Sequence, residues 1–261
     1  SGLGGLTAAR KIRSILPSED IIYFGDTSRV PYGGRSREIL LKYARQDVRF
    51  LRSFDIKAIV VACGTVSTTC LPQLQAENDL PVLGVVEPAC RRAVAVSKTR
   101  HVGLIATAAS VRSGTYEQII HALDPNVTVT ARACPLFVPL VENGRYERGD
   151  VVIETVAREY LEPIRGSGID TLILGCTHYP LLMDLIGEIM GPEVTLIDTG
   201  EEAAWELKRT LKAKDLLSDR AQEGTTTLYA SDQPEDFGLM AKHFLQEELT
   251  SPVLQVNIDR Y

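Results

Sequence analysis

The 261-residue sequence lacks the features that would place it at a membrane or on a nucleic acid. No apolar run approaches the roughly 18 residues that a membrane-spanning helix needs. There is no signal peptide with a basic start and an apolar middle, although the sequence begins at Ser1 without a methionine and we expect some N-terminal sequence to be missing. The net charge of −6 lacks the basic excess of nucleic-acid-binding proteins. We therefore expect a cytoplasmic protein that binds neither a membrane nor a nucleic acid.

Cysteine is scarce and poorly placed for crosslinks or metal. The five cysteines, Cys63, Cys70, Cys90, Cys134 and Cys176, are odd in number and widely spaced. This spacing argues against a zinc site, and a chain of this length does not need disulfide bonds for stability. We expect free thiols and no bound metal. A free cysteine is most often a small buried hydrophobic residue, and this is the prediction for Cys70, Cys90 and Cys134.

Short apolar runs rich in β-branched residues alternate with longer stretches of helical period. Continuous apolar strands separated by helices are typical of parallel sheets covered on both faces, so the fold class is predicted to be α/β. Strands are predicted at Ile21–Gly25, Ala58–Ala62, Val82–Val86, Val102–Ala106, Val127–Ala131, Thr171–Leu174, Val194–Ile197, Thr225–Tyr229 and Val253–Val256. Helices are predicted at Ser36–Ser53, Pro88–Lys98, Ser113–Leu123, Val151–Ile164, Glu201–Lys212 and Glu235–Glu247.

Two segments about a hundred residues apart resemble each other. Residues 57–65 and 170–177 each form an apolar strand that ends in a small residue, followed by a cysteine and then a threonine within two positions. The cysteines are Cys63 and Cys176. This repeat predicts two similar α/β lobes, each with a cysteine at the carboxyl end of a central strand.

The carboxyl end of a strand is where open α/β sheets bind their ligands. A cysteine there also lies near the N-terminus of the following helix, which favours its thiolate. Two buried structural cysteines would be the alternative explanation of Cys63 and Cys176. Their matched surroundings favour a functional pair instead.

Two opposed thiols suit the inversion of a chiral carbon that carries a weakly acidic proton. One thiolate removes the proton from one face, and the other thiol delivers a proton to the opposite face. The unperturbed pKa of cysteine, about 8.5, needs only a modest decrease for this acid–base work near neutral pH. The sequence therefore predicts a proton-transfer enzyme with its active site in a cleft between the two lobes.

Polar residues near these cysteines fit a small anionic amino acid, which backbone N–H groups can hold despite the negative net charge. Thr65 and Thr177 offer hydroxyls beside the thiols. The loop Pro31-Tyr32-Gly33 lets backbone amides approach a carboxylate, although a plain turn would have the same sequence. His178 is predicted to polarise or reprotonate the substrate or to orient Cys176.

Several longer motifs, spread over most of the chain, resemble those of the glutamate racemases in the aspartate/glutamate racemase superfamily. The most specific is Leu174-Gly-Cys-Thr-His-Tyr-Pro-Leu-Leu182, which separates glutamate racemases from their aspartate-handling relatives. The others are Ser1-Gly-Leu-Gly-Gly-Leu-Thr7, Tyr23-Phe-Gly-Asp-Thr-Ser-Arg-Val-Pro-Tyr-Gly33, Val61-Ala-Cys-Gly-Thr65, Gly103-Leu-Ile-Ala-Thr107 and Cys134-Pro-Leu-Phe-Val-Pro-Leu-Val-Glu142.

The resemblance implies conversion of L-glutamate to D-glutamate for peptidoglycan synthesis, without a cofactor. It implies two lobes related by a pseudo-twofold axis, residues 1–92 plus 203–261 and residues 93–202, and a possible homodimer. Cys63 would take the proton from D-glutamate and Cys176 from L-glutamate. Glu142 and His178 would be auxiliary acid–base residues. The implied substrate contacts are Ser1, Pro31, Tyr32, Gly33, Gly64, Thr65, Thr107, Thr177 and His178.

The chain departs from the family pattern at two places. The family has a first strand that ends in an aspartate just before the position of Ser1, and neither is in this sequence. The family also usually has an asparagine, which binds the substrate, where this chain has Gly64. The expected loss is on the order of 1 kcal/mol of binding. The corresponding hypothesis is that Gly64→Asn lowers the Michaelis constant.

Other functions are less compatible with the motifs. An aspartate or hydantoin racemase, or a related isomerase, would share the fold but not the Cys-Thr-His-Tyr-Pro run. A binding protein without turnover is suggested only by Gly64 and the absent aspartate, and it would not need two thiols. A nucleotide-binding protein is disfavoured because no phosphate-binding loop follows any predicted strand.

Overall fold

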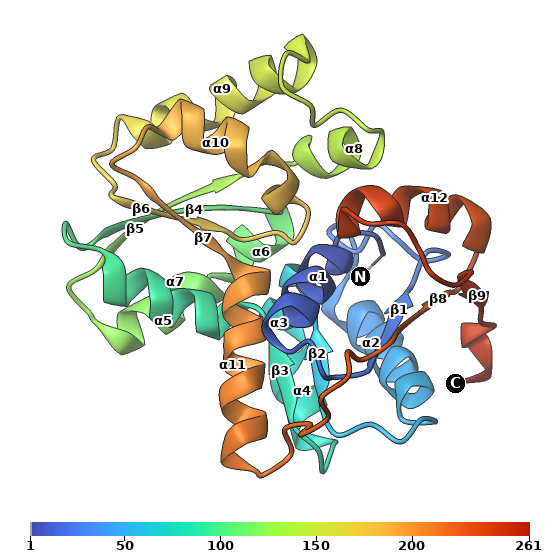
Figure 1. The fold of residues 1–261 in the computed structure, drawn as a ribbon. Coiled ribbons are helices and arrows are strands. Elements are labelled where there is room, and N and C mark those ends of the chain that lie inside the picture. Colours follow the sequence, from blue (N-terminus) through green and yellow to red (C-terminus); the bar gives the residue numbers. More distant parts are fainter. Residues whose placement is uncertain (1) are drawn as a thin grey trace.

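A computed structural model describes residues 2–261 as two α/β units joined side by side, with the long helix α11 (Thr199–Ala213) running between them (Figure 1). Every strand pair in both units is parallel. The predicted α/β class is therefore confirmed.

One unit is built on a four-stranded sheet with the order β5-β4-β6-β7. Helices α5 and α7 cover one face of this sheet, and α9 and α10 cover the other (Figure 1). Strand β6 is buried along its whole length because it lies in the interior of the sheet and is covered on both faces. The elements of this unit are α5 (Val86–Val96), β4 (His101–Ala106), α6 (Ala108–Ser113), α7 (Thr115–Leu123), β5 (Thr128–Ala133), α8 (Phe137–Glu142), α9 (Val151–Arg165), β6 (Thr171–Leu174), the 3₁₀ turn η1 (Tyr179–Leu182), α10 (Met183–Met190) and β7 (Thr195–Asp198).

The other unit contains two smaller sheets, with the orders β1-β8-β9 and β2-β3. Helix α1 packs against both α11 and α12, which ties the two ends of the chain together. The elements are α1 (Gly5–Ile15), β1 (Ile21–Gly25), α2 (Arg37–Leu51), β2 (Ile59–Val61), α3 (Gly64–Thr69), α4 (Leu71–Ala76), β3 (Val82–Gly84), β8 (Thr226–Ala230), α12 (Pro234–Leu245), β9 (Leu254–Gln255) and the 3₁₀ turn η2 (Ile258–Arg260).

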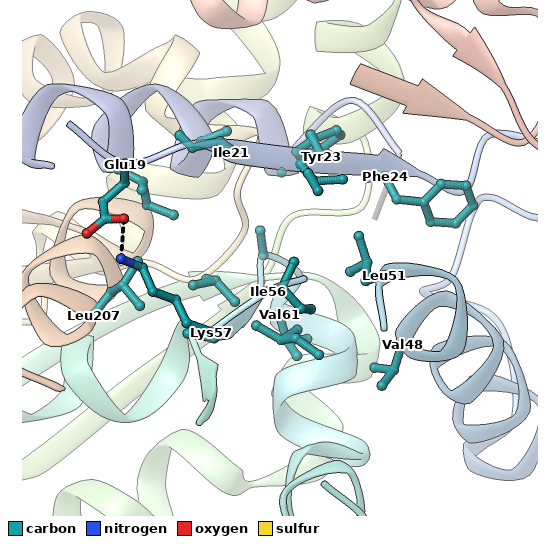
Figure 2. A pocket seen from close by; sticks show the side chains of 18 of the residues that line it. Glu19, Ile21, Tyr23, Phe24, Val48, Leu51, Ile56, Lys57, Val61 and Leu207 are labelled. Carbon is teal, nitrogen blue, oxygen red and sulfur yellow. Dashed lines mark ion pairs between the residues drawn. The ribbon is translucent and has the colours of Figure 1, made fainter. Parts of the chain in front are cut away.

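A groove of about 520 Å³ separates these two sheets (Figure 2). Within residues 2–261, β1 pairs only with β8 and β2 only with β3, so one edge of each strand faces the groove without a partner strand. Tyr23 and Val61 line its apolar walls, and an ion pair between Glu19 and Lys57, with an N–O distance of 2.6 Å, lies at one end. The parallel strands of this unit thus form two separate sheets within residues 2–261, because β1 and β2 are not joined.

The predicted strands all occur, with ends shifted by up to two residues. At Val82–Val86 the strand ends two residues earlier than predicted, at Gly84, and α5 begins at Val86. Pro88 does not prevent this early start because the first turn of a helix has no intrahelical acceptors to lose. Six α-helices were not predicted, namely α1, α3, α4, α6, α8 and α10.

No helix within residues 2–261 has the length and apolar character needed to cross a bilayer.

Candidate active site

The two cysteines singled out by the sequence both lie at carboxyl ends of strands. Cys63 follows β2 and is the N-cap residue of α3, while Cys176 follows β6 after a single glycine. Both are buried, with 8% and 7% of their surfaces exposed. The helix expected after Cys176 is only a 3₁₀ turn that begins three residues later, so the support from a helix dipole is weaker there than at Cys63.

A chain of side chains leads away from Cys176. Its Sγ lies 3.6 Å from Nδ1 of His178, and Nε2 of His178 lies 2.8 Å from Oε1 of Glu142. The ring of Phe244, from the other unit, packs edge-on against His178. Burial lowers the pKa of His178, but its hydrogen bonds to Cys176 and Glu142 more than offset this and raise it to about 9. An imidazolium is therefore favoured beside the Cys176 sulfur at neutral pH.

The first residues described also contact this side of the site. The Thr7 hydroxyl donates a hydrogen bond to the Thr177 carbonyl at 2.6 Å. A Cβ atom on Gly4 would lie 2.4 Å from the His178 ring, so only glycine allows the chain to pass there. The predicted contact residue Ser1 lies outside the described residues.

Three predicted substrate contacts meet on the other side. The Oγ1 atoms of Thr65 and Thr107 are 3.3 Å apart, although the two residues belong to different units. Thr107 is also the N-cap of α6, where its hydroxyl accepts from the Ser110 backbone N–H at 3.3 Å. Gly33 lies beside Thr107, because a Cβ atom on Gly33 would be 4.0 Å from the Thr107 Cβ. The structure therefore brings the Tyr32-Gly33 loop to the hydroxyls that follow Cys63 and β4.

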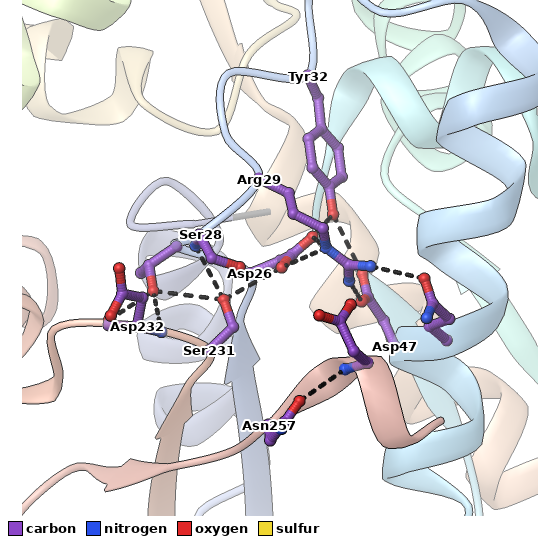
Figure 3. Close-up of polar contacts among 11 residues, drawn as sticks. Asp26, Ser28, Arg29, Tyr32, Asp47, Ser231, Asp232 and Asn257 are labelled. Carbon is purple, nitrogen blue, oxygen red and sulfur yellow. Dashed lines mark hydrogen bonds and ion pairs between the residues drawn. The ribbon is translucent and has the colours of Figure 1, made fainter.

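The side chain of Tyr32 points away from these hydroxyls into a buried ionic cluster (Figure 3). Its hydroxyl donates to the carboxylates of Asp26 and Asp47. Arg29 binds Asp26 with Nε at 2.9 and 2.7 Å, and it reaches Asp47 at 2.8 Å and the side-chain amide oxygen of Gln46 at 2.7 Å. Only the backbone of Tyr32 and Gly33 is thus left to face a ligand.

Two carboxylates share one guanidinium in this cluster. Burial, followed by the nearby charge of Asp26, raises the pKa of Asp47, and Arg29 and Tyr32 only partly offset this. Burial and the two carboxylates also raise the pKa of Tyr32, so its hydroxyl stays a hydrogen-bond donor. The cluster, which we call the Arg29 cluster (Asp26, Arg29, Tyr32, Gln46 and Asp47), anchors the loop that carries Gly33 to β1 and α2.

Sequence reasoning gave no role to Asp26, Arg29 or Asp47. Asp26 and Arg29 lie within the motif of residues 23–33. Their partner Asp47 lies on α2, and no local sequence pattern connects it to them. Pro31 is exposed at the cis peptide after Val30.

The remaining cysteines behave as predicted. Cys70, Cys90 and Cys134 are completely buried. Burial raises the pKa of Cys134 to about 12, and it also raises those of Cys70 and Cys90. These three are poor candidates for thiolate chemistry.

Tyr116 is a buried tyrosine that contacts Gly175, the residue directly before Cys176. Its hydroxyl donates to the Gly175 carbonyl at 3.4 Å. Burial, followed by negative charge on Cys90, Cys176 and Cys63, raises the pKa of Tyr116.

Comparison with known proteins agrees with this geometry. The Asp/Glu/Hydantoin racemase family model matches residues 10–207. The glutamate racemase of Geobacter metallireducens is 45% identical over 259 residues, which cover 99% of this chain and 95% of that protein. The chain belongs to the Asp/Glu/Hydantoin racemase family.

Solved racemase structures share the whole fold. A glutamate racemase isoform from Bacillus anthracis matches with a TM-score of 0.93 at 37% identity, over 98% of this chain and 95% of that one. The glutamate racemase of Francisella tularensis, solved in complex with D-glutamate, matches with a TM-score of 0.91 at 37% identity, over 100% and 96% of the two chains. The predicted resemblance and the prediction of a racemase are thereby confirmed.

Proposed function

We propose that this chain interconverts L-glutamate and D-glutamate by proton transfer between Cys63 and Cys176. The observation that carries the proposal is the placement of two buried thiols at the carboxyl ends of β2 and β6, one in each unit. Full-length similarity to glutamate racemases supports glutamate as the substrate.

The reaction balances without a redox partner. In the L to D direction the Cys176 thiolate takes the α-proton and becomes a thiol. The Cys63 thiol gives its proton to the opposite face of the carbanion and becomes a thiolate. Proton exchange with solvent then restores the starting forms of the two cysteines. Assignment of Cys176 to L-glutamate and Cys63 to D-glutamate follows the family resemblance.

His178 and Glu142 support the Cys176 half of this reaction. A protonated His178, 3.6 Å from the sulfur, stabilises negative charge on Cys176 before proton abstraction. Glu142 accepts from Nε2 at 2.8 Å and holds the ring in the orientation that points Nδ1 at the sulfur. Thr65, Thr107, Thr177 and the backbone of Tyr32-Gly33 supply donors for the carboxylates of the substrate, with Gly64 offering only its backbone N–H.

The unit boundaries and the cellular setting form part of the same proposal. Residues 1–92 plus 203–261 would make one lobe and residues 93–202 the other, and the open groove between β1 and β2 supports completion of the first lobe by one more parallel strand. The five unpaired cysteines support a reducing cytoplasm, where the product would serve peptidoglycan synthesis.

The decisive test uses the chain with its natural N-terminus, incubated with L-glutamate in D₂O without added cofactor. Circular dichroism would follow inversion, and NMR would follow loss of the α-proton. We expect both signals to change in the wild type and inversion to be abolished in Cys63→Ser and Cys176→Ser. Cys70→Ala, which removes a buried thiol outside the site, is the matched control and should racemise. A folded chain that exchanges neither enantiomer of glutamate would overturn the proposal, and turnover of aspartate or a hydantoin instead would reassign the substrate.

A further inference from the structure

The two units touch, backbone to backbone, at the residues beside the two cysteines. Gly64 immediately follows Cys63, and Gly175 immediately precedes Cys176. A Cβ atom on Gly64 would lie 2.7 Å from the carbonyl oxygen of Gly175 and 3.7 Å from Oγ of Ser110. Cβ atoms essentially never approach another atom within 3.0 Å, so something would have to move.

The Gly175 carbonyl cannot easily move. Gly175 directly follows β6, and its N–H donates to the Ile105 carbonyl of the adjacent β4 at 2.7 Å. A Cβ atom on Gly175 would itself be 2.8 Å from that same oxygen, which shows how closely the two strands pack there. The Tyr116 hydroxyl also donates to the Gly175 carbonyl.

Gly64 is held equally firmly by its own unit. It is the first residue of α3, and the Ser67 N–H donates to the Cys63 carbonyl at 2.9 Å. The Ser67 hydroxyl in turn donates to the Val61 carbonyl at 3.1 Å, which fastens the helix start to β2. The easiest response to a side chain at position 64 is therefore a separation of the two units.

We infer that Gly64 is a positioning residue that sets how closely the two units approach and hence the spacing of Cys63 and Cys176. This inference rests on the proposed racemisation. Any larger residue would have to lengthen the 2.7 Å approach to the ordinary contact range, which begins at 3.4 Å. Cys63 and Cys176 are the immediate neighbours of Gly64 and Gly175, so the two cysteines would move apart with the two backbone segments.

Nearby contacts between the units would lengthen at the same time. The Thr65–Thr107 hydroxyl pair is 3.3 Å apart, and the Thr115 hydroxyl donates to the Thr68 carbonyl at 3.0 Å. Both pairs join α3 to the unit that carries Cys176. They provide a structural measure of separation that does not depend on activity.

This geometry argues against the hypothesis that an asparagine at position 64 improves binding. The amide of Gly64→Asn would be attached to a Cβ atom that collides with the Gly175 carbonyl. In this variant the two thiols would move apart, and this would outweigh any hydrogen bond that the asparagine made to the substrate. In this chain Gly64 thus allows the two units to approach closely, and its lack of a side chain is not simply the loss of a substrate contact.

Wider thiol spacing should affect inversion more than proton abstraction. A substrate that stays with one thiol still loses its α-proton there, and the thiol can exchange with D₂O and return deuterium to the same face. Delivery from the opposite thiol becomes slower because proton transfer depends steeply on geometry, with misplacement by about 1 Å costing up to roughly 100-fold. The ratio of α-proton exchange to inversion should therefore rise.

The test compares Gly64→Ala with Gly187→Ala in the full-length enzyme, using both enantiomers of glutamate in D₂O. Gly187 lies inside α10, where an added Cβ would meet only Leu196 Cδ1, at an ordinary 3.7 Å. For Gly64→Ala we expect kcat for inversion to fall at least tenfold, KM to change much less, and the exchange-to-inversion ratio to rise severalfold. Gly187→Ala should match the wild type. A crystal structure of Gly64→Ala should show a longer Thr65–Thr107 distance.

Each other outcome has a defined meaning. An unchanged ratio and kcat in Gly64→Ala, or equal losses of exchange and inversion, would overturn the inference while leaving the racemase proposal intact. Failure of Gly64→Ala to fold, when Gly187→Ala folds, would also overturn it, because the glycine would then serve stability rather than spacing. A wild type that exchanges neither enantiomer would instead defeat the proposed function itself.

Discussion

Nε2 of His178 lies 2.8 Å from Oε1 of Glu142, and this contact crosses from the turn after β6 to the end of α8. Because the opposite ring nitrogen faces Cys176 at 3.6 Å, the carboxylate can affect the thiol only through the ring. Glu142 is therefore a positioning residue for one half of the reaction.

Glu142→Gln should weaken proton abstraction by Cys176 more than abstraction by Cys63. The two enantiomers have equal free energy, so kcat/KM must fall equally in both directions and cannot report the side affected. Exchange without inversion can do so. We expect α-proton exchange of L-glutamate in D₂O to fall roughly tenfold or more, with a smaller effect on D-glutamate. The exposed neighbour Glu147→Gln is the control, and equal losses for both enantiomers would contradict this role of Glu142.

The raised pKa of His178 should make folding stability depend on pH. Its folded pKa is about 9, above the unfolded value of 6.5, so its stabilising contribution is complete below pH 6.5 and is lost as pH rises through 9. The loss should be on the order of 3 kcal/mol, from the size of the shift. Urea unfolding from pH 6 to 10 would measure it. The decline should be absent in His178→Asn and present in the variant of an exposed histidine, His121→Asn.

The Arg29 cluster predicts a second decline of stability with rising pH, caused by Asp47 and centred at lower pH than that of His178. Its pKa is raised from 3.8 to about 7, so the folded protein prefers the neutral carboxyl and loses stability as pH rises from about 4 through 7. Asp47→Asn keeps an oxygen for Arg29 and removes the excess charge. We expect this variant to be at least as stable as the wild type at pH 8 and to show a flatter stability profile over that range. A large loss of stability at pH 8 would show that both carboxylates are needed in charged form.

Removing the shared cation should be far more harmful. Arg29→Ala leaves the carboxylates of Asp26 and Asp47 buried together, and breaking such a buried ion pair costs about 3–5 kcal/mol. The loop with Tyr32 and Gly33 would also lose its anchor, so KM for glutamate should rise more than kcat falls. Arg35→Ala, which changes an exposed arginine in the same loop, should have neither effect. Chemical denaturation and steady-state kinetics would distinguish the two variants.

The elements that sequence reasoning located well are those with a strong local signal. Thr171–Leu174 was predicted to the residue, because a largely apolar run of four residues that ends at Gly175 is too short for a helix. Helix α1 was not predicted, and its start at Gly4 and Gly5 has no polar side chain to cap it and so gives little helix signal. Helix α8, which carries Glu142, was missed because it has only six residues and contains a proline.

The site was predictable to the extent that its chemistry is local. Cys63 and Cys176 each carry their own context of strand end and adjacent threonine. By contrast, the ion pair between Arg29 and Asp47 and the close approach of Gly64 to Gly175 form only when distant segments of the chain meet in the fold. A glycine in the sequence does not show which atom a side chain at its position would have contacted.

The open edges beside the groove leave β2 and Cys63 without the restraint that holds β6 and Cys176. Backbone hydrogen bonds on both sides fix β6 in register, whereas β2 has a ladder on one side only and otherwise depends on apolar packing, which resists sliding weakly. The strand that positions Cys63 is thus less restrained than the strand that positions Cys176. With the groove unfilled, amide protons of β2 should exchange with solvent much faster than those of β6, and a strand paired with β2 in the groove should slow them. A strand that occupied the groove would pair with the open edge of β2 and would so restrain the Cys63 half of the enzyme, in a groove that Cys63 itself lines.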